Sequence, residues 1–264
     1  MADTWEHELS VAEAAALEAG ELLMRGFRAE VGVSRKGRVD VVTEFDLRAE
    51  ALVRARLTEA FPNHRIVGEE GSDTGEGDLV WYIDPIDGTA NFVHGHSYFG
   101  VSIGLCRNGR ALAGVIHAPA RGQTWKAAAG LGAFRDGSKC QVSTRPALDE
   151  ALCTTGFPLD PAATDDTNEA EFGAFLHKAR GVRHCGSAAL DLALVGDGTF
   201  DVFWERALNP WDIAAGAVIV EEAGGQISAY DGSPADVRSG ELVASNGLLH
   251  SDAVGLIQSV RANR

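Results

Sequence analysis

The segment from Trp81 to Gly95, which reads WYIDPIDGTANFVHG, constrains this chain more than any other. It begins as an apolar strand and runs into two acids, Asp84 and Asp87, which a Pro-Ile pair separates. Pro85 fixes its own φ and lacks an N–H, so we expect the chain to turn after Asp84 and to present the Ile86 carbonyl beside both carboxylates. Converging oxygen ligands would suit a divalent metal ion, although a D-x-x-D-G pattern alone is more often a solvated turn.

The next two residues favour an anion beside that cation. Gly88 has no side chain, which allows another group to approach the backbone closely. If Thr89 begins a short helix, its amide points outward, as amides at helix N-termini do when they bind phosphate. The segment therefore predicts neighbouring sites for a metal ion and a phosphate group.

Two further acids adjoin apolar segments elsewhere in the chain. Glu69 directly follows a short apolar strand at 65–68, which makes it a candidate metal ligand. Asp212 lies in the first turn of a predicted helix, because Asn209 is a good N-cap residue and Pro210 suits the first helical position. An acid in that turn also interacts favourably with the helix dipole, so a structural role alone explains Asp212 about as well.

Three motifs together are similar to those of the inositol monophosphatase family, whose members are metal-dependent phosphatases. They read GEE at 68–70, DPIDGTANF at 84–92, and WDIAAG at 211–216 followed by EEAGG at 221–225. The motifs occur in the family's order and at compatible spacing, and they span nearly the whole chain. The resemblance implies an α/β, or layered α+β, fold in which helices and sheets alternate as an α-β-α-β-α sandwich.

The resemblance also implies that two or three Mg²⁺ ions share one site. The metal ligands that it implies are Glu69, Asp84, the Ile86 carbonyl, Asp87 and Asp212. Asp84 would bridge two of the ions. An all-oxygen set of ligands favours Mg²⁺ over Zn²⁺, because zinc sites in proteins usually include His or Cys.

Catalytic and substrate roles are implied for further residues. Glu69 and Thr89 would position and deprotonate the attacking water, and Asp46 would orient the Thr89 hydroxyl, although Asp46 is also explained as an acid in the first turn of a helix. The substrate residues that the resemblance implies are Gly88, Thr89, Ser187, Ala188 and Glu205. The first two would hold phosphate, and Glu205 would contact substrate hydroxyls. An ordinary helix N-cap explains Ser187 equally well.

The implied reaction is hydrolysis of a small polyol phosphate, first of all inositol monophosphate, by in-line attack of a metal-activated water. Histidinol phosphate is an alternative substrate, because Glu205 would bind an ammonium group as well as a hydroxyl. An alternative of another class is a non-catalytic binding partner in a regulatory complex, but the intact set of acids favours the enzyme. The resemblance further implies inhibition by lithium and a homodimer.

Charge and composition limit the kinds of molecule that the protein is expected to bind. The chain has 23 Lys and Arg against 38 Asp and Glu, and the resulting formal charge of −15 disfavours binding to nucleic acid or to an anionic membrane. The sequence has no apolar run of about eighteen residues and no signal-peptide pattern at its N-terminus. Its four cysteines lack C-x-x-C spacing, so we expect reduced thiols in a cytoplasmic protein.

Hydrophobic periodicity predicts helices and strands along the whole chain. Helices are expected at 3–28, 43–60, 168–179, 187–195, 210–223 and 251–261. Strands are expected at 65–68, 151–156, 182–184, 200–205, 225–230 and 241–245, with an antiparallel meander across 99–142. We expect two halves, 1–145 and 146–264, that form one compact unit. The stretch at 29–39 resembles a mobile loop of the family, in which Arg35 or Lys36 would contact metal-bound water.

Overall fold

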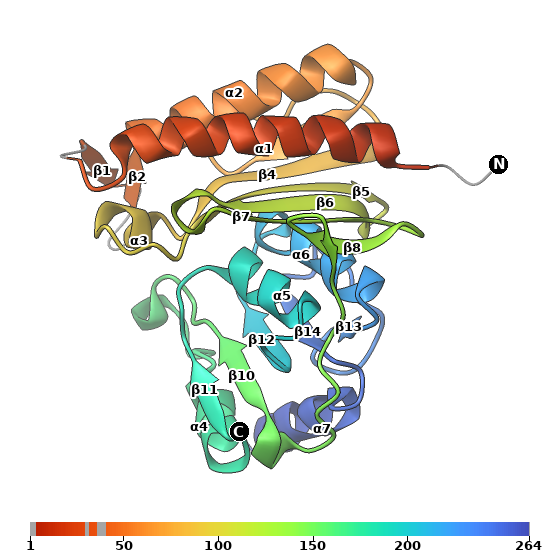
Figure 1. Ribbon diagram of the computed structural model, residues 1–264. Coiled ribbons are helices and arrows are strands. Elements are labelled where there is room, and N and C mark those ends of the chain that lie inside the picture. Colours follow the sequence, from red (N-terminus) through yellow and green to blue (C-terminus); the bar gives the residue numbers. More distant parts are fainter. Residues whose placement is uncertain (1–3, 30–31, 36–40, 264) are drawn as a thin grey trace.

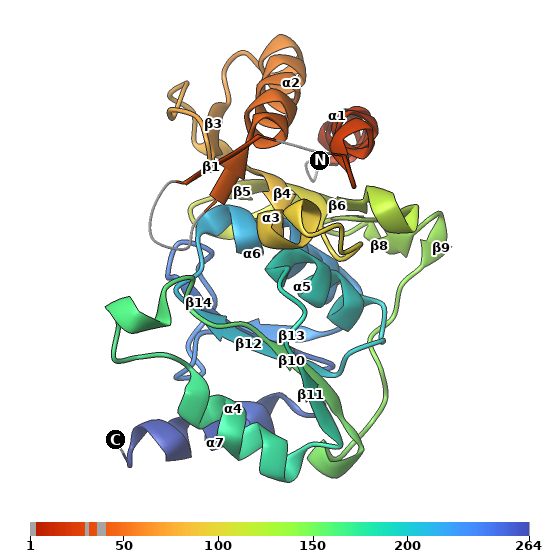
Figure 2. The same ribbon diagram turned by 90° about the vertical axis from the view of Figure 1, so that its left-hand side faces the viewer.

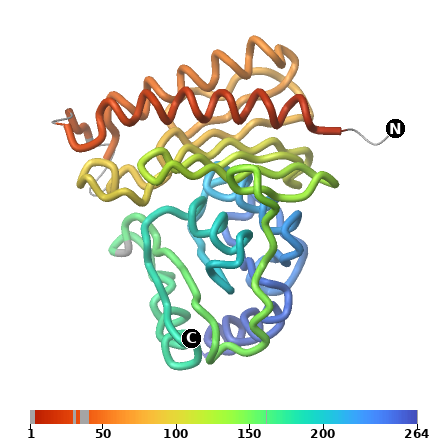
Figure 3. Tube along the Cα trace, viewed as in Figure 1, coloured from red at the N-terminus to blue at the C-terminus, as the bar shows by residue number. Residues whose placement is uncertain are grey.

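Helices and sheets alternate as five layers in the computed structural model, which describes residues 4–29, 32–35 and 41–263 (Figure 1). Two helices cover one face of a seven-stranded sheet, two more lie between this sheet and a five-stranded sheet, and a last pair covers the far face of the second sheet. The turned view in Figure 2 separates the same layers. This is the α-β-α-β-α order expected from the sequence. The described chain begins at the first layer and ends at the last (Figure 3).

The first helix layer packs small side chains against the seven-stranded sheet. It consists of α1 (Glu6–Gly26) and α2 (Glu44–Ala60). One face of α1 buries four alanines at spacings typical of a helix, Ala12, Ala15, Ala16 and Ala19. α2 begins with a capping box, in which the backbone N–H and the hydroxyl of Thr43 donate to Asp46 at 2.8 and 2.6 Å. The cap fixes Asp46 at the end of α2 that faces α3.

The seven-stranded sheet has the order β3-β4-β5-β6-β7-β8-β9. Its strands are β3 (Arg65–Gly68), β4 (Leu79–Asp87), β5 (Gly100–Arg107), β6 (Arg110–Ala118), β7 (Gln123–Ala128), β8 (Gly132–Arg135) and β9 (Ser138–Lys139). β3 and β4 are parallel, and the other neighbours are antiparallel. The parallel pair places Gly68 beside Ile83, so the chain leaves β3 next to the acids of β4.

The chain does not turn after Asp84, and in this respect the expectation from Pro85 is wrong. β4 continues to Asp87, and its register against β5 shifts between the two acids, since Asp84 lies opposite Ser102 and Asp87 lies opposite Gly100. Three steps along β4 match two along β5, which is a β-bulge. Residues three apart on a regular strand point to opposite faces. The extra residue of the bulge instead brings both carboxylates into one pocket.

The middle layer consists of α5 (Ala188–Gly196) and α6 (Pro210–Glu222). All of α5 is buried, and so is every residue of α6 from Ile213 to Val220. A helix that is apolar on all sides is typical of a position between two other layers. The layer therefore joins the two sheets into one core.

The five-stranded sheet has the order β11-β10-β12-β14-β13. Its strands are β10 (Leu152–Thr155), β11 (Gly181–Arg183), β12 (Val202–Arg206), β13 (Gln226–Ser228) and β14 (Glu241–Ser245). The outer helices are α4 (Glu169–Lys178) and α7 (His250–Arg261). Phe175 of α4 stacks on Trp204 of β12 at 3.7 Å between ring centroids, which anchors this layer to the sheet.

The predicted helices and strands are present, with ends that differ by a few residues. Two short antiparallel strands were not predicted, β1 (Val33–Arg35), which lies within the expected loop at 29–39, and β2 (Val41–Thr43), which follows that loop. A short helix does begin at Thr89, as considered from the sequence, and it is α3 (Thr89–Val93). The 3₁₀ helices Pro119–Arg121, Leu148–Glu150 and Pro161–Ala163 were not predicted. Lys36 and the Arg35 side chain lie outside the described residues, so their expected role stays a prediction, as does the division at residue 145.

Among the residues that the structure describes, none of the helices combines the length and the apolar character needed to cross a lipid bilayer.

Candidate active site

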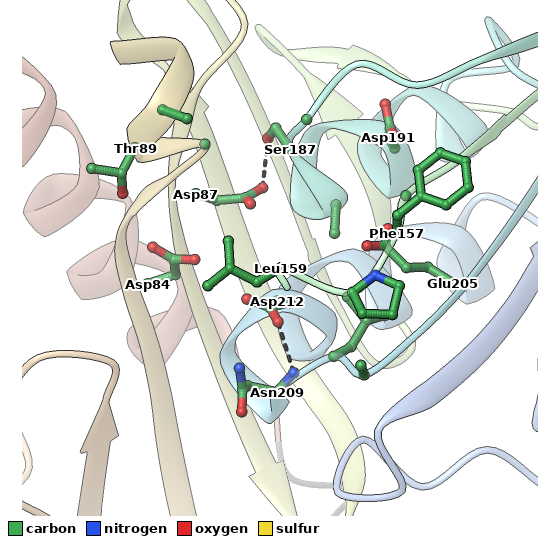
Figure 4. A pocket seen from close by; sticks show the side chains of 18 of the residues that line it. Asp84, Asp87, Thr89, Phe157, Leu159, Ser187, Asp191, Glu205, Asn209 and Asp212 are labelled. Carbon is green, nitrogen blue, oxygen red and sulfur yellow. Dashed lines mark hydrogen bonds between the residues drawn. The ribbon is translucent and has the colours of Figure 1, made fainter. Parts of the chain in front are cut away.

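A pocket of about 650 Å³ opens where β4 and α3 meet the starts of α5 and α6 (Figure 4). Ten predicted site residues line it: Glu69, Asp84, Ile86, Asp87, Gly88, Thr89, Ser187, Ala188, Glu205 and Asp212. Asp46 is the exception, and it reaches the pocket through a hydrogen bond to Thr89. Residues as far apart in the sequence as Glu69 and Asp212 thus come together at one place.

Three of the predicted metal ligands meet in this pocket. Asp84, Asp87 and Asp212 each offer one carboxylate oxygen, and these oxygens lie within 4.8 Å of one another. Asp84 also accepts the backbone N–H two residues further along the chain at 2.9 Å. Asp87 and Asp212 each accept a backbone N–H at the start of a middle-layer helix at 2.7 Å. These bonds fix one oxygen of each carboxylate, so that the other can face a cation.

Burial makes these three acids difficult to ionise. Desolvation is the largest cause, and it raises the pKa of Asp84 well above its usual range, that of Asp87 to about 6 and that of Asp212 to about 8. The charge of Glu69 adds to the rise at Asp84 and Asp212. Buried acids so close together are stable as anions only beside a cation. The oxygen ligands and their spacing therefore fit a hard divalent ion such as Mg²⁺.

Glu69 reaches the same pocket from the end of β3. Its N–H donates to the Ile83 carbonyl at 3.1 Å, one residue before Asp84. The side chain is half-buried and lines the pocket, although the cluster of carboxylate oxygens within 4.8 Å does not include it. The structure thus brings Glu69 to the rim of the cluster.

Thr89 stands between Asp46 and the bulge of β4. Its hydroxyl lies 3.1 Å from Asp46 Oδ1 and 3.0 Å from the Ile86 carbonyl, and it can donate to either. Asp46 is fully buried, and its other oxygen accepts from Thr43. Burial raises the pKa of Asp46, while the hydrogen bonds from Thr43 and Thr89 lower it. With its proton directed inward, the Thr89 oxygen can accept a hydrogen bond from the pocket.

Ser187 connects one of the predicted metal ligands, Asp87, to the middle layer. It is the N-cap of α5, and its hydroxyl donates to Asp87 Oδ2 at 2.5 Å (Figure 4). The Ala189 N–H donates to the same oxygen at 2.7 Å. Asp87 thus serves as an anionic partner for the N-terminus of α5, across the boundary between the two sheets. The Ser187 hydroxyl contacts a candidate metal ligand, whereas Ala188 lines the pocket.

The far end of the pocket combines an acid with apolar side chains. Glu205 is half-buried, and a Cβ on Gly156 would lie 2.1 Å from its Oε1, so a side chain at position 156 would displace this carboxylate. Phe157 packs edge-on against His184, and Leu159, which is 64% exposed, also lines the pocket (Figure 4). This end of the pocket therefore offers an acceptor for hydroxyl or ammonium groups beside an apolar wall.

Two further residues of the site were not predicted. Asp191 of α5 lines the pocket and accepts the hydroxyls of Tyr98 at 2.6 Å and Thr154 at 2.8 Å, while burial raises its pKa to about 7. An acid inside the apolar stretch SAALDLALV was the signal for it. Asn91, within the DPIDGTANF motif, donates to the carbonyls of Tyr98 at 2.7 Å and Cys185 at 2.9 Å, and so fastens α3 to the loop before α5.

Known proteins resemble this chain along nearly its whole length. A model of the inositol monophosphatase family matches residues 4–263. An inositol-1-monophosphatase from Synechocystis sp. is 43% identical over 94% of this chain and 87% of its own length, and the Nus factor SuhB of Pseudomonas aeruginosa is 42% identical over 90% and 91%. The solved structure of an inositol monophosphatase from Anabaena (Nostoc) sp. superimposes with a TM-score of 0.89 at 39% identity, covering 96% of both chains. The chain therefore belongs to the inositol monophosphatase family of phosphatases.

Proposed function

We propose that this protein is a Mg²⁺-dependent phosphomonoesterase that hydrolyses a small polyol phosphate, with inositol monophosphate as its main substrate. The observation that carries the proposal is the cluster of Asp84, Asp87 and Asp212, whose oxygens lie within 4.8 Å of one another in a pocket of about 650 Å³. A pocket of this size can hold a small phosphate ester. Family membership supports the reaction class, and the carboxylate ligands support Mg²⁺.

In this proposal the three aspartates, Glu69 and the Ile86 carbonyl hold two or three Mg²⁺ ions. Mg²⁺, when bound, would offset the charge of the phosphate and lower the pKa of a nearby water. Glu69 and Thr89 would position that water and accept its proton, while Asp46, 3.1 Å from the Thr89 hydroxyl, keeps this group oriented. The amides of Gly88 and Thr89 would orient the phosphate for in-line attack.

Glu205 and Ala188 would contact the leaving alcohol at the far end of the pocket. A polyol suits Glu205, because a carboxylate accepts hydrogen bonds from adjacent hydroxyls. Ser187 would act indirectly, by holding Asp87 in place. Phosphate release from inositol 1-phosphate, histidinol phosphate and glycerol 2-phosphate tests the choice of substrate. Equal kcat/KM values for the first two would contradict the preference for a polyol.

Asp212→Asn tests the metal site with little structural change, because Asn can still accept the Asn209 N–H that Asp212 Oδ2 accepts at 2.7 Å. Losing a metal ligand should lower Mg²⁺-dependent kcat/KM at least about 100-fold. The matched control is Asp252→Asn, which removes the same charge from the first turn of α7, where the residue is exposed. Phosphate release by Asp212→Asn at the rate of Asp252→Asn would contradict the proposal.

A second candidate function is suggested by the Pseudomonas aeruginosa relative, whose name makes it a Nus factor. A protein that acts only as a partner in a regulatory complex would release phosphate from none of the three esters, whatever the Mg²⁺ concentration. The family resemblance also supports inhibition by lithium and a homodimer. Assays with added LiCl and light scattering of the purified protein test these two properties separately.

A further inference from the structure

A buried acid on α2 holds the loop that carries Glu69. Glu50 is only 2% exposed, and its two oxygens have different partners. Oε1 accepts from Arg54 Nε at 2.7 Å, and Oε2 accepts from the Glu70 N–H at 2.7 Å. The second bond reaches the peptide that joins Glu69 to Glu70. The Glu50 carboxylate therefore holds the peptide that follows Glu69 as the chain leaves β3.

Arg54 holds the same loop at its base. Its Nη1 donates to the Ile66 carbonyl at 3.3 Å and lies 3.4 Å from the Thr74 hydroxyl oxygen. Ile66 and Thr74 also exchange both backbone hydrogen bonds, at 2.8 and 3.0 Å, which closes the loop of residues 67–73. α2 thus holds the loop at two places. Arg54 binds it where Ile66 and Thr74 close the loop, and Glu50 binds it beside Glu69.

Two glycines of the loop, Gly68 and Gly71, show how closely the loop surrounds Glu50. A Cβ on Gly68 would lie 2.4 Å from Glu50 Cδ, and a Cβ on Gly71 would lie 2.5 Å from Glu50 Oε1. Neither glycine has the positive φ that itself favours this residue. The G-E-E-G sequence at 68–71 is therefore required by contact with the Glu50 carboxylate.

We propose that Glu50 and Arg54 are positioning residues, which direct the Glu69 carboxylate toward Asp84 and thereby set the affinity of the site for Mg²⁺. This inference rests on the proposed function, in which Glu69 is a metal ligand. Groups that orient metal ligands typically contribute about 10- to 100-fold in affinity. In Glu50→Gln the amide NH₂ must face either Arg54 Nε or the Glu70 N–H, so one of the two hydrogen bonds is lost.

Calorimetric titration of the metal-free full-length protein with Mg²⁺ measures this effect without turnover. We expect Glu50→Gln to raise the Kd at least about tenfold. The matched control is Asp201→Asn, since Asp201 is also fully buried and accepts one backbone N–H, from Leu152 at 2.7 Å, and one guanidinium, from Arg145 at 3.0 Å. Asp201 does not line the pocket, so its variant should lose thermal stability but keep the wild-type Kd.

Gly71→Ala supplies a second variant in case Glu50→Gln does not fold, because Gly71 is exposed and its added methyl group presses on Glu50 from the loop side. Both variants should need more Mg²⁺ for half-maximal phosphate release, whereas kcat at saturating Mg²⁺ returns to within about threefold of wild type. If the wild type binds no Mg²⁺, the proposed function fails. If the wild type binds it and these variants bind equally well, or Asp201→Asn weakens binding as much, the positioning role is overturned and the proposed function stands.

Discussion

At the scale of single residues, substitutions of Thr89 test whether its hydroxyl takes part in proton transfer or in binding the metal ion. Thr89→Val removes the hydroxyl that lies 3.1 Å from Asp46 Oδ1 and keeps the shape of the side chain. We expect kcat to fall about 100-fold, as is typical when a group that handles a proton is lost, with little change in the Mg²⁺ concentration for half-maximal rate. Thr89→Ser keeps the hydroxyl and should stay within about tenfold of wild type. A Thr89→Val enzyme as fast as Thr89→Ser would exclude this role.

The sequence could predict those site residues that lie in motifs with a recognisable local structure, such as the end of a strand or the start of a helix. Asp84 and Asp87 follow an apolar strand, and Asp212 follows an N-cap and a proline, so each had a defined place before the fold was known. Glu50 and Asp191 lie outside such motifs, since Glu50 is one of several acids in α2 and the apolar stretch around Asp191 indicates only that this acid is buried. What makes them important is burial and long-range hydrogen bonds, at 2.7 Å to the Glu70 N–H and 2.6 Å to the Tyr98 hydroxyl.

At the scale of elements, the junction of β4 and α3 depends on a glycine. Gly88 has a φ of 94°, and an added Cβ would lie 2.9 Å from the Gly186 carbonyl oxygen. Gly137 has a φ of 79° but no atom within 4 Å of an added Cβ, so Gly137→Ala introduces the backbone strain alone. We expect Gly137→Ala to cost about 1 kcal/mol of unfolding free energy and Gly88→Ala about 2–3 kcal/mol.

Turnover distinguishes the two glycine variants further. Gly88→Ala pushes apart α3 and the loop that leads into α5, and so it should lower kcat/KM at least about tenfold. Gly137 lies in the turn between β8 and β9 and is exposed, so its variant should keep the wild-type rate. Urea denaturation and phosphate release on both proteins give the comparison. Equal losses of unfolding free energy and of kcat/KM in the two variants would show that the contact with Gly186 contributes neither to stability nor to activity.

Elements were predictable where local chemistry decides their ends. Thr43 caps α2, and Asn209 with Pro210 begins α6, as their residue types indicate. The β-bulge in β4 was not predictable, because a proline between two acids favours a turn unless a neighbouring strand continues the ladder. β5 supplies that neighbour, with Gly100 opposite Asp87. Tertiary pairing overrode the local preference at the position where the site needs both acids on one side.

At the scale of the whole molecule, the site depends on contact between the two sheets and the layer that they share. Asp84 and Asp87 come from the first sheet, whereas Asp212 comes from the start of α6. The layer order followed from the family resemblance, but the distance between these acids is a property of the packed layers. The cluster therefore gathers like charges that are far apart in the unfolded chain, and folding without a cation must offset their repulsion.

Burial of these acids, together with their repulsion, makes the stability of the metal-free protein depend on pH. The folded pKa of Asp212 is about 8, above its usual value of 3.8, so between these two values the folded state keeps a proton that the unfolded state has released. The unfolding free energy must then decrease as pH rises through that window. Asp87, whose folded pKa is about 6, adds the same dependence over the lower part of the window.

Buried histidines change the unfolding free energy in the opposite direction as pH rises. The pH range of the experiment therefore determines whether the histidines or the carboxylates dominate the result. Burial lowers the pKa of His64, His117 and His250, which makes the folded state gain stability as pH rises through about 6.5. Between about pH 7 and pH 8 the histidines are mostly neutral in both states, so the effect of the carboxylates outweighs theirs. In EDTA we therefore expect the thermal midpoint to fall across this range and Asp212→Asn to make the decline less steep, since Asp84 and Asp191 still contribute to it. Mg²⁺ binds only the ionised acids, so the midpoint gained on adding it should increase from pH 7 to pH 8. A midpoint in EDTA that does not change over this range, or a decline as steep in Asp212→Asn as in the wild type, would mean that burial and mutual repulsion do not raise the pKa of Asp212 as its place in the pocket requires.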